Sequence, residues 1–259
     1  MSTKAESAQP PQRNIGFSML APIKRLVRSQ LKNHGRHLIY VPRNEPAGLE
    51  LEHDLPLIVT AGCPVIFDVG ANVGQSIDLF SRLFPRSSIY AFEPAADCFA
   101  LLNEKYTNER VRLFQVALSS SDGTREFFCY QRSVLNSLLP LDNHPANPFA
   151  NMEMINRTVV TTRAVDSIIR DVGVSQIDLL KIDTQGWDYE VLLGAQRALA
   201  DGRVAAVMVE LNFIPMYRGQ RFGETISSYL REQEFHLIDF YEKVRQGRHL
   251  AWCTALFSR

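Results

Sequence analysis

Four acidic residues lie at or beside the ends of short apolar runs, the kind of run that forms a buried strand. They are Asp68, Glu93, Asp183 and Glu210. If the strands are parallel, their carboxyl ends lie along one edge of the sheet, where ligands bind in such folds. A carboxylate at that edge can accept hydrogen bonds from ligand hydroxyls or take up a proton. The sequence therefore predicts one polar site shared by these four acids.

A glycine-rich turn follows the first apolar run. Asp68 is followed by Gly70, Asn72 and Gly74, and then by apolar residues at helical spacing. A strand, a turn and a helix in succession bring backbone N–H groups and a helix N-terminus close to a nucleotide-like ligand. Because glycine lacks a Cβ, it permits positive φ and a close approach of the ligand to the backbone.

Two classes of cofactor use such a turn, and Asp68 and Glu93 distinguish them. Glu93 lies 19 residues after Gly74, at the end of the next apolar run. A carboxylate there can accept hydrogen bonds from ribose hydroxyls. A dinucleotide site would need a Gly-x-Gly-x-x-Gly pattern, and Asp68 would repel a pyrophosphate. The acid suits a cationic sulfonium amino acid, so the turn favours S-adenosylmethionine over NAD.

Apolar runs and helical patterns alternate along the chain and predict a mostly parallel sheet with helices on both faces. The strands are expected at 65–69, 88–92, 111–118, 124–130, 158–162, 177–182, 204–211, 235–241 and 250–257. The helices are expected at 51–60, 77–83, 95–106, 165–172, 189–199 and 223–233. The last two strands can pair antiparallel. Residues 131–157 have no clear period and are expected to form a polar loop that selects the substrate.

Several motifs resemble those of the FkbM family of methyltransferases. They are Val65-Ile66-Phe67-Asp68-Val69-Gly70-Ala71-Asn72-Val73-Gly74, Tyr90-Ala91-Phe92-Glu93-Pro94, Leu180-Lys181-Ile182-Asp183-Thr184-Gln185-Gly186, the segment 191–195 and the turn 119–123. The resemblance implies a class I methyltransferase (Rossmann-like) fold, with a seven-stranded, mostly parallel sheet, helices on both faces and an antiparallel C-terminal strand. It also implies methyl transfer from S-adenosylmethionine, usually to an oxygen of a sugar or natural product.

The same resemblance implies which residues hold the cofactor. The glycine-rich turn would hold the methionine part, the acid after the second strand the ribose, and residues 116–118 would border the adenine. The expected cofactor-binding residues are Asp68, Gly70, Asn72, Gly74, Glu93, Pro94, Val116, Ala117 and Asp183. The chain departs from the family at one position, because Gln185 stands where the family segment often has Glu. A neutral amide cannot serve as a base or as a strong metal ligand.

Asp183, Glu210 and His144 are the candidate catalytic residues. A hydroxyl nucleophile benefits from a carboxylate or imidazole that accepts its proton. We expect Asp183 to orient or deprotonate the acceptor hydroxyl, and the alternative is that it caps the helix that follows. Glu210 could assist or be a buried hydrogen-bonding acid. His144 could be a base in the irregular loop or a solvated surface residue.

Four further side chains are candidates for contact with the acceptor. Asn136 and Ser137 could hydrogen-bond a sugar hydroxyl. Trp187 and Tyr217 could form a stacking platform for a sugar ring, with core packing as the other use of Trp187. The acceptor would then be a small molecule or a glycan. An NAD-dependent oxidoreductase and a non-catalytic nucleoside-binding module remain the alternative functions.

The composition of the chain limits which partners and which location we expect for the protein. Its 28 basic and 28 acidic residues balance, so bulk charge gives no reason to expect a nucleic-acid partner. No apolar run is long enough to span a bilayer, and no secretory signal is evident. The four cysteines are scattered, which argues against a zinc site or a disulfide framework and favours a cytoplasmic location. The spacing of the acids does not demand a metal ion.

The sequence divides into three expected parts. Residues 1–14 are predicted to be a disordered tail, 15–60 a basic helix with a lead-in, and 61–259 a single methyltransferase domain with a substrate loop at 131–157. The basic helix could pack on the domain as a lid, or contact an anionic membrane surface or an acidic substrate.

Overall fold

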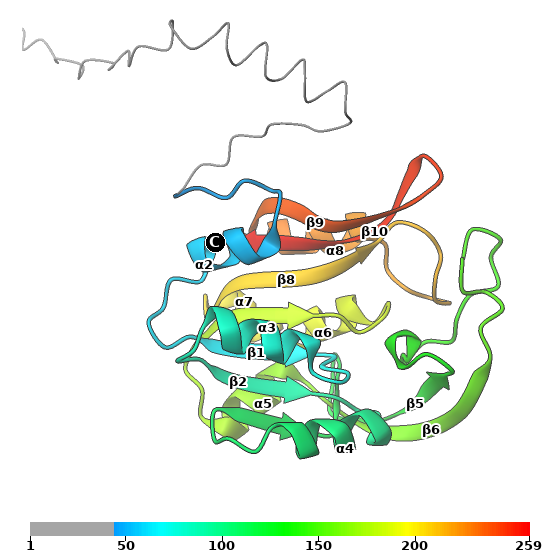
Figure 1. Cartoon of the computed structure of the whole chain (residues 1–259), viewed down its shortest axis with the longest axis horizontal. Helices are drawn as coiled ribbons and strands as arrows, with labels where there is room; N and C mark the ends of the chain where they lie inside the picture. The colour runs from blue at the N-terminus through cyan, green and yellow to red at the C-terminus, as the bar shows by residue number, and fades with distance from the viewer. Residues whose placement is uncertain (1–43) are drawn as a thin grey trace, which may run out of the picture. The chain divides into compact units, whose positions relative to one another are not determined.

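Seven strands form the central sheet, five of them parallel neighbours that are followed by an antiparallel hairpin (Figure 1). The computed structural model describes residues 44–259, so the predicted tail and basic helix lie outside the described residues. In spatial order the parallel strands are β3 (Val111–Phe114), β2 (Ser88–Phe92), β1 (Val65–Val69), β7 (Ile177–Ile182) and β8 (Val204–Asn212). The next strand, β10 (His249–Ser258), runs antiparallel to β8, and β9 (His236–Gln246) lies at the edge of the sheet, antiparallel to β10. This order confirms the predicted fold class.

Helices cover both faces of this sheet, because the strands are apolar on both sides. One face packs against α5 (Val165–Val172), α6 (Asp188–Gly194), α7 (Gln196–Ala200) and α8 (Gly223–Glu232). The other face packs against α2 (Leu51–Ile58), α3 (Gln75–Leu83) and α4 (Ala96–Lys105). Among the described residues, none of the helices combines the length and the apolar character needed to cross a membrane.

The order of the strands reverses between β1 and β7. The chain runs from β1 outward to β2 and β3, and later from β7 outward to β8 on the other side. The loops that leave β1 and β7 therefore diverge and leave a crevice at the carboxyl ends of these two strands. The backbone N–H of Asp183 donates to the carbonyl of Val69 at 3.0 Å, which joins the two strand ends at this point.

A second, three-stranded sheet lies beside the first and corrects one prediction. The expected strand at 111–118 is two strands, because the chain turns tightly where the N–H of Val116 donates to the carbonyl of Phe114 at 2.9 Å. After this turn β4 (Ala117–Leu118) leaves the central sheet and pairs with β6 (Met154–Arg163), which also pairs with β5 (Gly123–Tyr130). The turn places residues 116–118 at the carboxyl-end edge of the main sheet.

Other boundaries also differ from the predictions, and the strand expected at 235–241 extends to Gln246. The helix expected at 189–199 is broken into α6 and α7 after Gly194, where a Cβ would lie 2.0 Å from the carbonyl oxygen of Ser119. The loop expected to extend to residue 157 ends earlier, because β6 begins at Met154. The first residues of β6 are exposed, so they lack the apolar and polar alternation by which a half-buried strand is found in sequence. The loop also contains the short 3-10 helix η1 (Ser133–Leu135), and its apolar residues pack against Ile214, Met216 and Tyr217 in a small separate core.

The lead-in before the first strand is anchored by one buried acid. Asp54 of α2 accepts hydrogen bonds from the backbone N–H groups of Ala47 and Gly48. It also accepts one from the hydroxyl of Tyr241 on β9 at 2.8 Å. These contacts fix α2 beside the C-terminal strands, where Leu51 reaches the cavity described below.

Candidate active site

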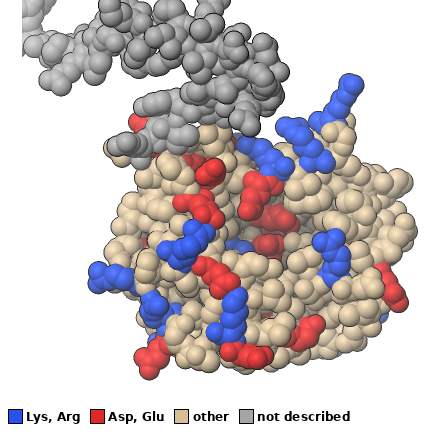
Figure 2. All heavy atoms as spheres, viewed as in Figure 1, with Lys and Arg blue, Asp and Glu red and all other residues tan. Residues whose placement is uncertain are grey.

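A cavity of about 370 Å³ lies at the carboxyl ends of β1, β2, β7 and β8. Figure 2 shows acidic side chains around and inside a hollow on this face of the molecule. The four carboxylates that line the cavity are Glu93, Asp183, Glu210 and Glu242. Three of them are acids that the sequence placed at strand ends, and they come together as expected from the parallel sheet.

The turn after β1 forms the floor of this cavity. Gly70 has φ +80°, and a Cβ there would lie 1.9 Å from the carbonyl oxygen of Asp183. Gly70 and Asn72 both line the cavity. Gly74 is not among the lining residues, because the ring of Tyr106 covers the space beside it, and the Tyr106 hydroxyl donates to the Gly74 carbonyl at 2.7 Å. Gly74 therefore begins α3 and shapes the turn without facing the cavity.

Asp68 occupies a different place from the one expected. It is fully buried, and its Oδ1 lies 2.9 Å from Nζ of Lys181, the residue directly opposite on β7. Ser76 donates to the other carboxylate oxygen at 2.5 Å. Asp68 is thus absent from the cavity wall, which corrects the expectation that its carboxylate directly faces a cationic cofactor. Its negative charge is already matched by a lysine in the adjacent strand.

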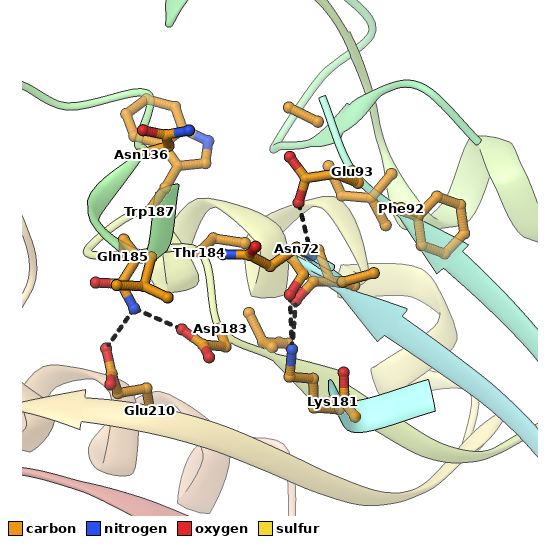
Figure 3. Close-up of a pocket in the computed structure, with 18 of the residues that line it drawn as sticks. Asn72, Phe92, Glu93, Asn136, Lys181, Asp183, Thr184, Gln185, Trp187 and Glu210 are labelled. Atoms are coloured by element: carbon orange, nitrogen blue, oxygen red, sulfur yellow. Dashed lines mark hydrogen bonds between the residues drawn. The ribbon is translucent and has the colours of Figure 1, made fainter. Parts of the chain in front are cut away.

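Lys181 is a cavity residue that the sequence reasoning missed. Its ammonium also donates to the carbonyl oxygen of Gly70 at 2.9 Å, so it braces the glycine turn from below (Figure 3). Burial disfavours the charged ammonium, but the carboxylates of Asp68 and Asp183 outweigh burial and raise the pKa of Lys181. A signal was present, because a charge inside a strand buried on both faces needs a partner. The apolar strands β1 and β7 each carry one such charge, Asp68 in β1 and Lys181 in β7.

Glu93 stands at the end of β2 with both oxygens held by backbone. Oε2 accepts the N–H of Asn72 and Oε1 accepts the N–H of Ala95, each at 2.8 Å. The side chain is 6% exposed, and burial raises its pKa to about 7. Each carboxylate oxygen can accept more than one hydrogen bond, so Glu93 retains acceptor capacity toward the cavity. This geometry fits a pair of ligand hydroxyls.

An apolar recess lies beside Glu93. Pro94, Val116 and Ala117 line it as expected, together with residues that the sequence did not single out: Leu118, Phe127 and Leu138. Trp187 also lines the cavity, and its indole N–H donates to the hydroxyl of Ser119 at 3.2 Å. An apolar, partly aromatic recess next to a hydroxyl-binding carboxylate suits a flat base attached to a ribose.

Asp183, Gln185 and Glu210 form a connected group at the other side of the β1 turn (Figure 3). Nε2 of Gln185 donates to Oδ1 of Asp183 at 2.7 Å and to Oε2 of Glu210 at 3.2 Å. Burial, and then the negative charges of Asp183 and Asp188, raise the pKa of Glu210 well above its ordinary value. Two carboxylates are thus held side by side by one amide that the sequence reasoning set aside.

The alternative role of Asp183 as a helix cap is not seen, and the turn before α6 is held by another acid. Asp188, in the first turn of α6, accepts the N–H groups of Thr184 at 2.9 Å and Gly186 at 3.1 Å. Asp183 makes no capping bond to α6, whose N-cap residue Trp187 also makes none through its side chain. The Asp183 carboxylate is therefore available to contact a ligand in the cavity.

The remaining candidate residues are divided between the cavity and other places. Asn136 lines the cavity, but its Oδ1 already accepts the N–H of Tyr130 at 2.8 Å. Ser137 is buried and donates to the carbonyl of Gln185 at 2.7 Å. Tyr217 is 1% exposed, so it is a core residue and not a stacking platform. Its hydroxyl instead donates to Oε1 of Gln185 at 2.9 Å.

His144 lies outside the cavity, which corrects its nomination as a base. It is exposed, and its Nδ1 accepts the backbone N–H of Ala146 at 3.1 Å. The hydrogen bond closes a local turn in a Pro-containing stretch. Position in an irregular loop could not reveal which side of the loop faces the site.

One arm of the cavity could not be anticipated from the sequence motifs. Leu51, Leu79, Met208, Glu242 and Thr254 line it. Thr254 lies opposite Glu210 in the β8–β10 pairing and donates to Oε2 of Glu242 at 2.8 Å. These residues come from distant segments that only the order of the strands brings together. Within residues 44–259, no group of three His, Cys, Asp or Glu side chains is arranged to hold a metal ion.

The strand order and the position of the cavity define a class I methyltransferase fold. The crystal structure of methyltransferase FkbM from Methylobacillus flagellatus has the same fold, with a TM-score of 0.52, 15% identity, and coverage of 76% of this chain and 44% of that one. Residues 68–237 match the methyltransferase FkbM domain. The chain therefore belongs to the FkbM methyltransferase family.

Two methyltransferases are similar in sequence to this chain. The 2-O-methyltransferase NoeI of Sinorhizobium fredii is 26% identical over 69% of this chain and 75% of its own length. The 31-O-demethyl-FK506 methyltransferase FkbM of Streptomyces tacrolimicus is 31% identical over 52% of this chain and 60% of its own length. The NAD-dependent oxidoreductase and the non-catalytic module are not favoured by these similarities.

Proposed function

We propose that the protein transfers a methyl group from S-adenosylmethionine to a hydroxyl of a sugar, glycan or natural product. The observation that carries the proposal is the cavity itself, which has a hydroxyl-accepting Glu93 beside an apolar recess and a carboxylate pair across the β1 turn. The names of both relatives refer to methylation at oxygen, which supports a hydroxyl acceptor. The acceptor is a small molecule or a glycan.

The residues present fit the proposed cofactor. Glu93 would bind the ribose hydroxyls, the recess beside Val116 and Ala117 would hold the adenine, and Gly70 and Asn72 would border the methionine part. The absence of a Cβ at Gly70 lets the turn pack directly against the carbonyl of Asp183, which fixes its position at the cavity. When bound, S-adenosylmethionine supplies a methyl group activated by the positive sulfur.

The chain contributes position and proton transfer. The cavity would hold the acceptor oxygen in line with the methyl carbon, so that the new O–C bond forms as the C–S bond breaks. Asp183 lies beside the glycine turn and would accept the proton that the hydroxyl loses. Glu210, whose pKa is raised by burial and by the nearby carboxylates, would form a hydrogen bond with the acceptor.

Replacing Asp183 tests this function. Asp183→Asn keeps the shape of the side chain and an oxygen that can accept the hydrogen bond of Gln185, but it removes the base. We expect kcat with labelled S-adenosylmethionine and a hydroxyl acceptor to fall roughly 10²- to 10⁴-fold. Calorimetry should show that affinity for S-adenosylmethionine is retained. Wild-type turnover by this variant would remove Asp183 from the mechanism.

A cytoplasmic location is also proposed. The cysteines within the described residues are free, and Cys63 is exposed, which suits a reducing compartment. Contact of the basic N-terminal helix with a membrane stays a prediction, because that segment lies outside the described residues.

A further inference from the structure

Gln185 connects the two carboxylates of the cavity through a single side-chain amide. Its nitrogen donates to Oδ1 of Asp183 at 2.7 Å and to Oε2 of Glu210 at 3.2 Å (Figure 3). A primary amide has two N–H hydrogens, and the two carboxylates use both of them. Asn212 donates to the same oxygen of Glu210 at 3.3 Å. The other oxygen of each carboxylate is then the one available to the acceptor.

The orientation of this amide is fixed by its surroundings. The hydroxyl of Tyr217 donates to Oε1 of Gln185 at 2.9 Å, so the amide oxygen faces away from the acids. The opposite orientation would point an acceptor oxygen at two carboxylates, and the tyrosine hydroxyl would keep only the carbonyl of Leu135, at 3.2 Å, as an acceptor. The backbone of Gln185 has φ +56°, and Ser137 donates to its carbonyl. Three separate segments of the chain thus determine where one side chain points.

The charge of the pair explains why an amide is useful there. Two nearby carboxylates repel each other, and this repulsion favours the uptake of a proton by one of them. Burial and the charges of Asp183 and Asp188 raise the pKa of Glu210, which favours its protonated form. An N–H donor favours the ionised form of a carboxylate. Gln185 donates to both carboxylates, but its bond to Asp183 is the shorter one, 2.7 Å against 3.2 Å to Glu210. It therefore favours the charged form of Asp183 more than that of Glu210, without adding a charge of its own.

We propose that Gln185 is a positioning residue for methyl transfer, which sets the protonation pattern of the carboxylate pair by donating one amide hydrogen to each partner. It acts through Asp183, because the bond to Oδ1 holds that carboxylate in place and leaves its other oxygen for the acceptor. This inference rests on the proposed function, since it assigns the base of that reaction. It gives a role to the position at which this chain departs from the family motif.

Two variants of Gln185 separate this role from a packing role. Gln185→Glu puts a third carboxylate beside the other two, and Gln185→Met removes the amide donors at similar volume. We expect the acidic limb of the kcat/KM pH profile, where the base becomes protonated, to move upward by about one unit or more in Gln185→Glu. The limb should move in the same direction, by less, in Gln185→Met.

Ser137→Ala is the matched control. It removes the bond to the backbone carbonyl of Gln185 but leaves the amide and its carboxylate partners. A structural role of this region would change stability or KM in all three variants without moving the limb, and this result would overturn the proposal. Thermal unfolding of each variant identifies any that fails to fold, and the remaining Gln185 variant then decides the question.

A second measurement needs neither cofactor nor acceptor. Titration of ¹³C-labelled side-chain carboxyls by NMR follows the pair in the protein alone, with Asp183→Asn and Glu210→Gln used for assignment. The titration midpoints of the pair should rise in Gln185→Glu and stay in place in Ser137→Ala. Unchanged midpoints in both Gln185 variants would refute the inference. An inactive wild-type protein that shows the shifts would instead contradict the proposed function alone.

Discussion

Burial in this cavity shifts the pKa of individual side chains away from its usual value in water. Glu93 shows the effect on the cofactor side, because burial raises its pKa to about 7 while two backbone N–H groups hold its oxygens. A carboxylate with this pKa is half ionised near neutral pH. Ligand hydroxyls donate more strongly to the ionised form. Affinity for a ribose-containing cofactor should therefore depend on pH in the physiological range.

The prediction for Glu93 concerns both affinity and its pH dependence. In wild-type protein, S-adenosylmethionine should bind more tightly as pH rises from 6 to 8, because the carboxylate loses its proton over that interval. Glu93→Gln should weaken binding roughly tenfold or more, since hydrogen bonds to a charged group contribute about 1.5–3 kcal/mol. It should also flatten the pH dependence. Calorimetry at several pH values measures both quantities, and equal affinity of the two proteins at pH 8 would exclude the ribose assignment.

At the scale of elements, the register of β1 against β7 places two opposite charges inside the sheet. Asp68 lies directly opposite Lys181, and their side chains are 0% and 7% exposed. The pair also ties the glycine turn to β7, because the ammonium donates to the carbonyl of Gly70. A slip of one residue would separate the charges in an apolar environment, so the pair stabilises one register over others.

Breaking this pair should be costly, and removing both charges should be less so. Lys181→Met leaves the carboxylate of Asp68 buried without its partner, and the free energy of unfolding should fall by about 3–5 kcal/mol. Asp68→Asn combined with Lys181→Met should recover part of that loss. Urea denaturation of the three proteins measures the difference. A single variant as stable as wild type would show that Asp68 can find another partner or remain protonated without cost.

The strands also show which parts of the fold and of the site could be predicted from the sequence. Strands β1, β2 and β7 were found with their bounds because each is a short apolar run closed by an acid or a turn. Glu93 and Asp183 followed from that pattern, since parallel strands bring their ends together. The pattern gave no distances, so it could not show that the acid inside the first strand pairs sideways with Lys181. It also could not reveal the amide bridge of Gln185, which depends on positive φ and on contacts with Tyr217.

At the scale of the whole described molecule, the fold collects negative charge around one cavity. Carboxylates from the ends of β2, β7 and β8 and from within β9 line it. Lys181 is the one basic residue that lines it within residues 44–259, and Asp68 neutralises that charge. Charges of one sign around a concave surface reinforce each other's potential. The cavity should therefore favour neutral or cationic acceptors over acceptors that carry a carboxylate or phosphate.

This selectivity can be measured with a matched pair of acceptors, a neutral sugar and the same sugar bearing a carboxylate. For the wild-type protein, kcat/KM should be roughly three- to tenfold lower for the charged acceptor, and high salt should narrow the difference because it screens the cavity charges. Glu242→Gln removes one carboxylate from the cavity wall, yet the amide oxygen of the new side chain can still accept the hydrogen bond of Thr254. The variant should improve methylation of the charged acceptor more than that of the neutral one. Equal efficiency with both acceptors in the wild-type protein at low salt would show that the acidic wall does not select the substrate.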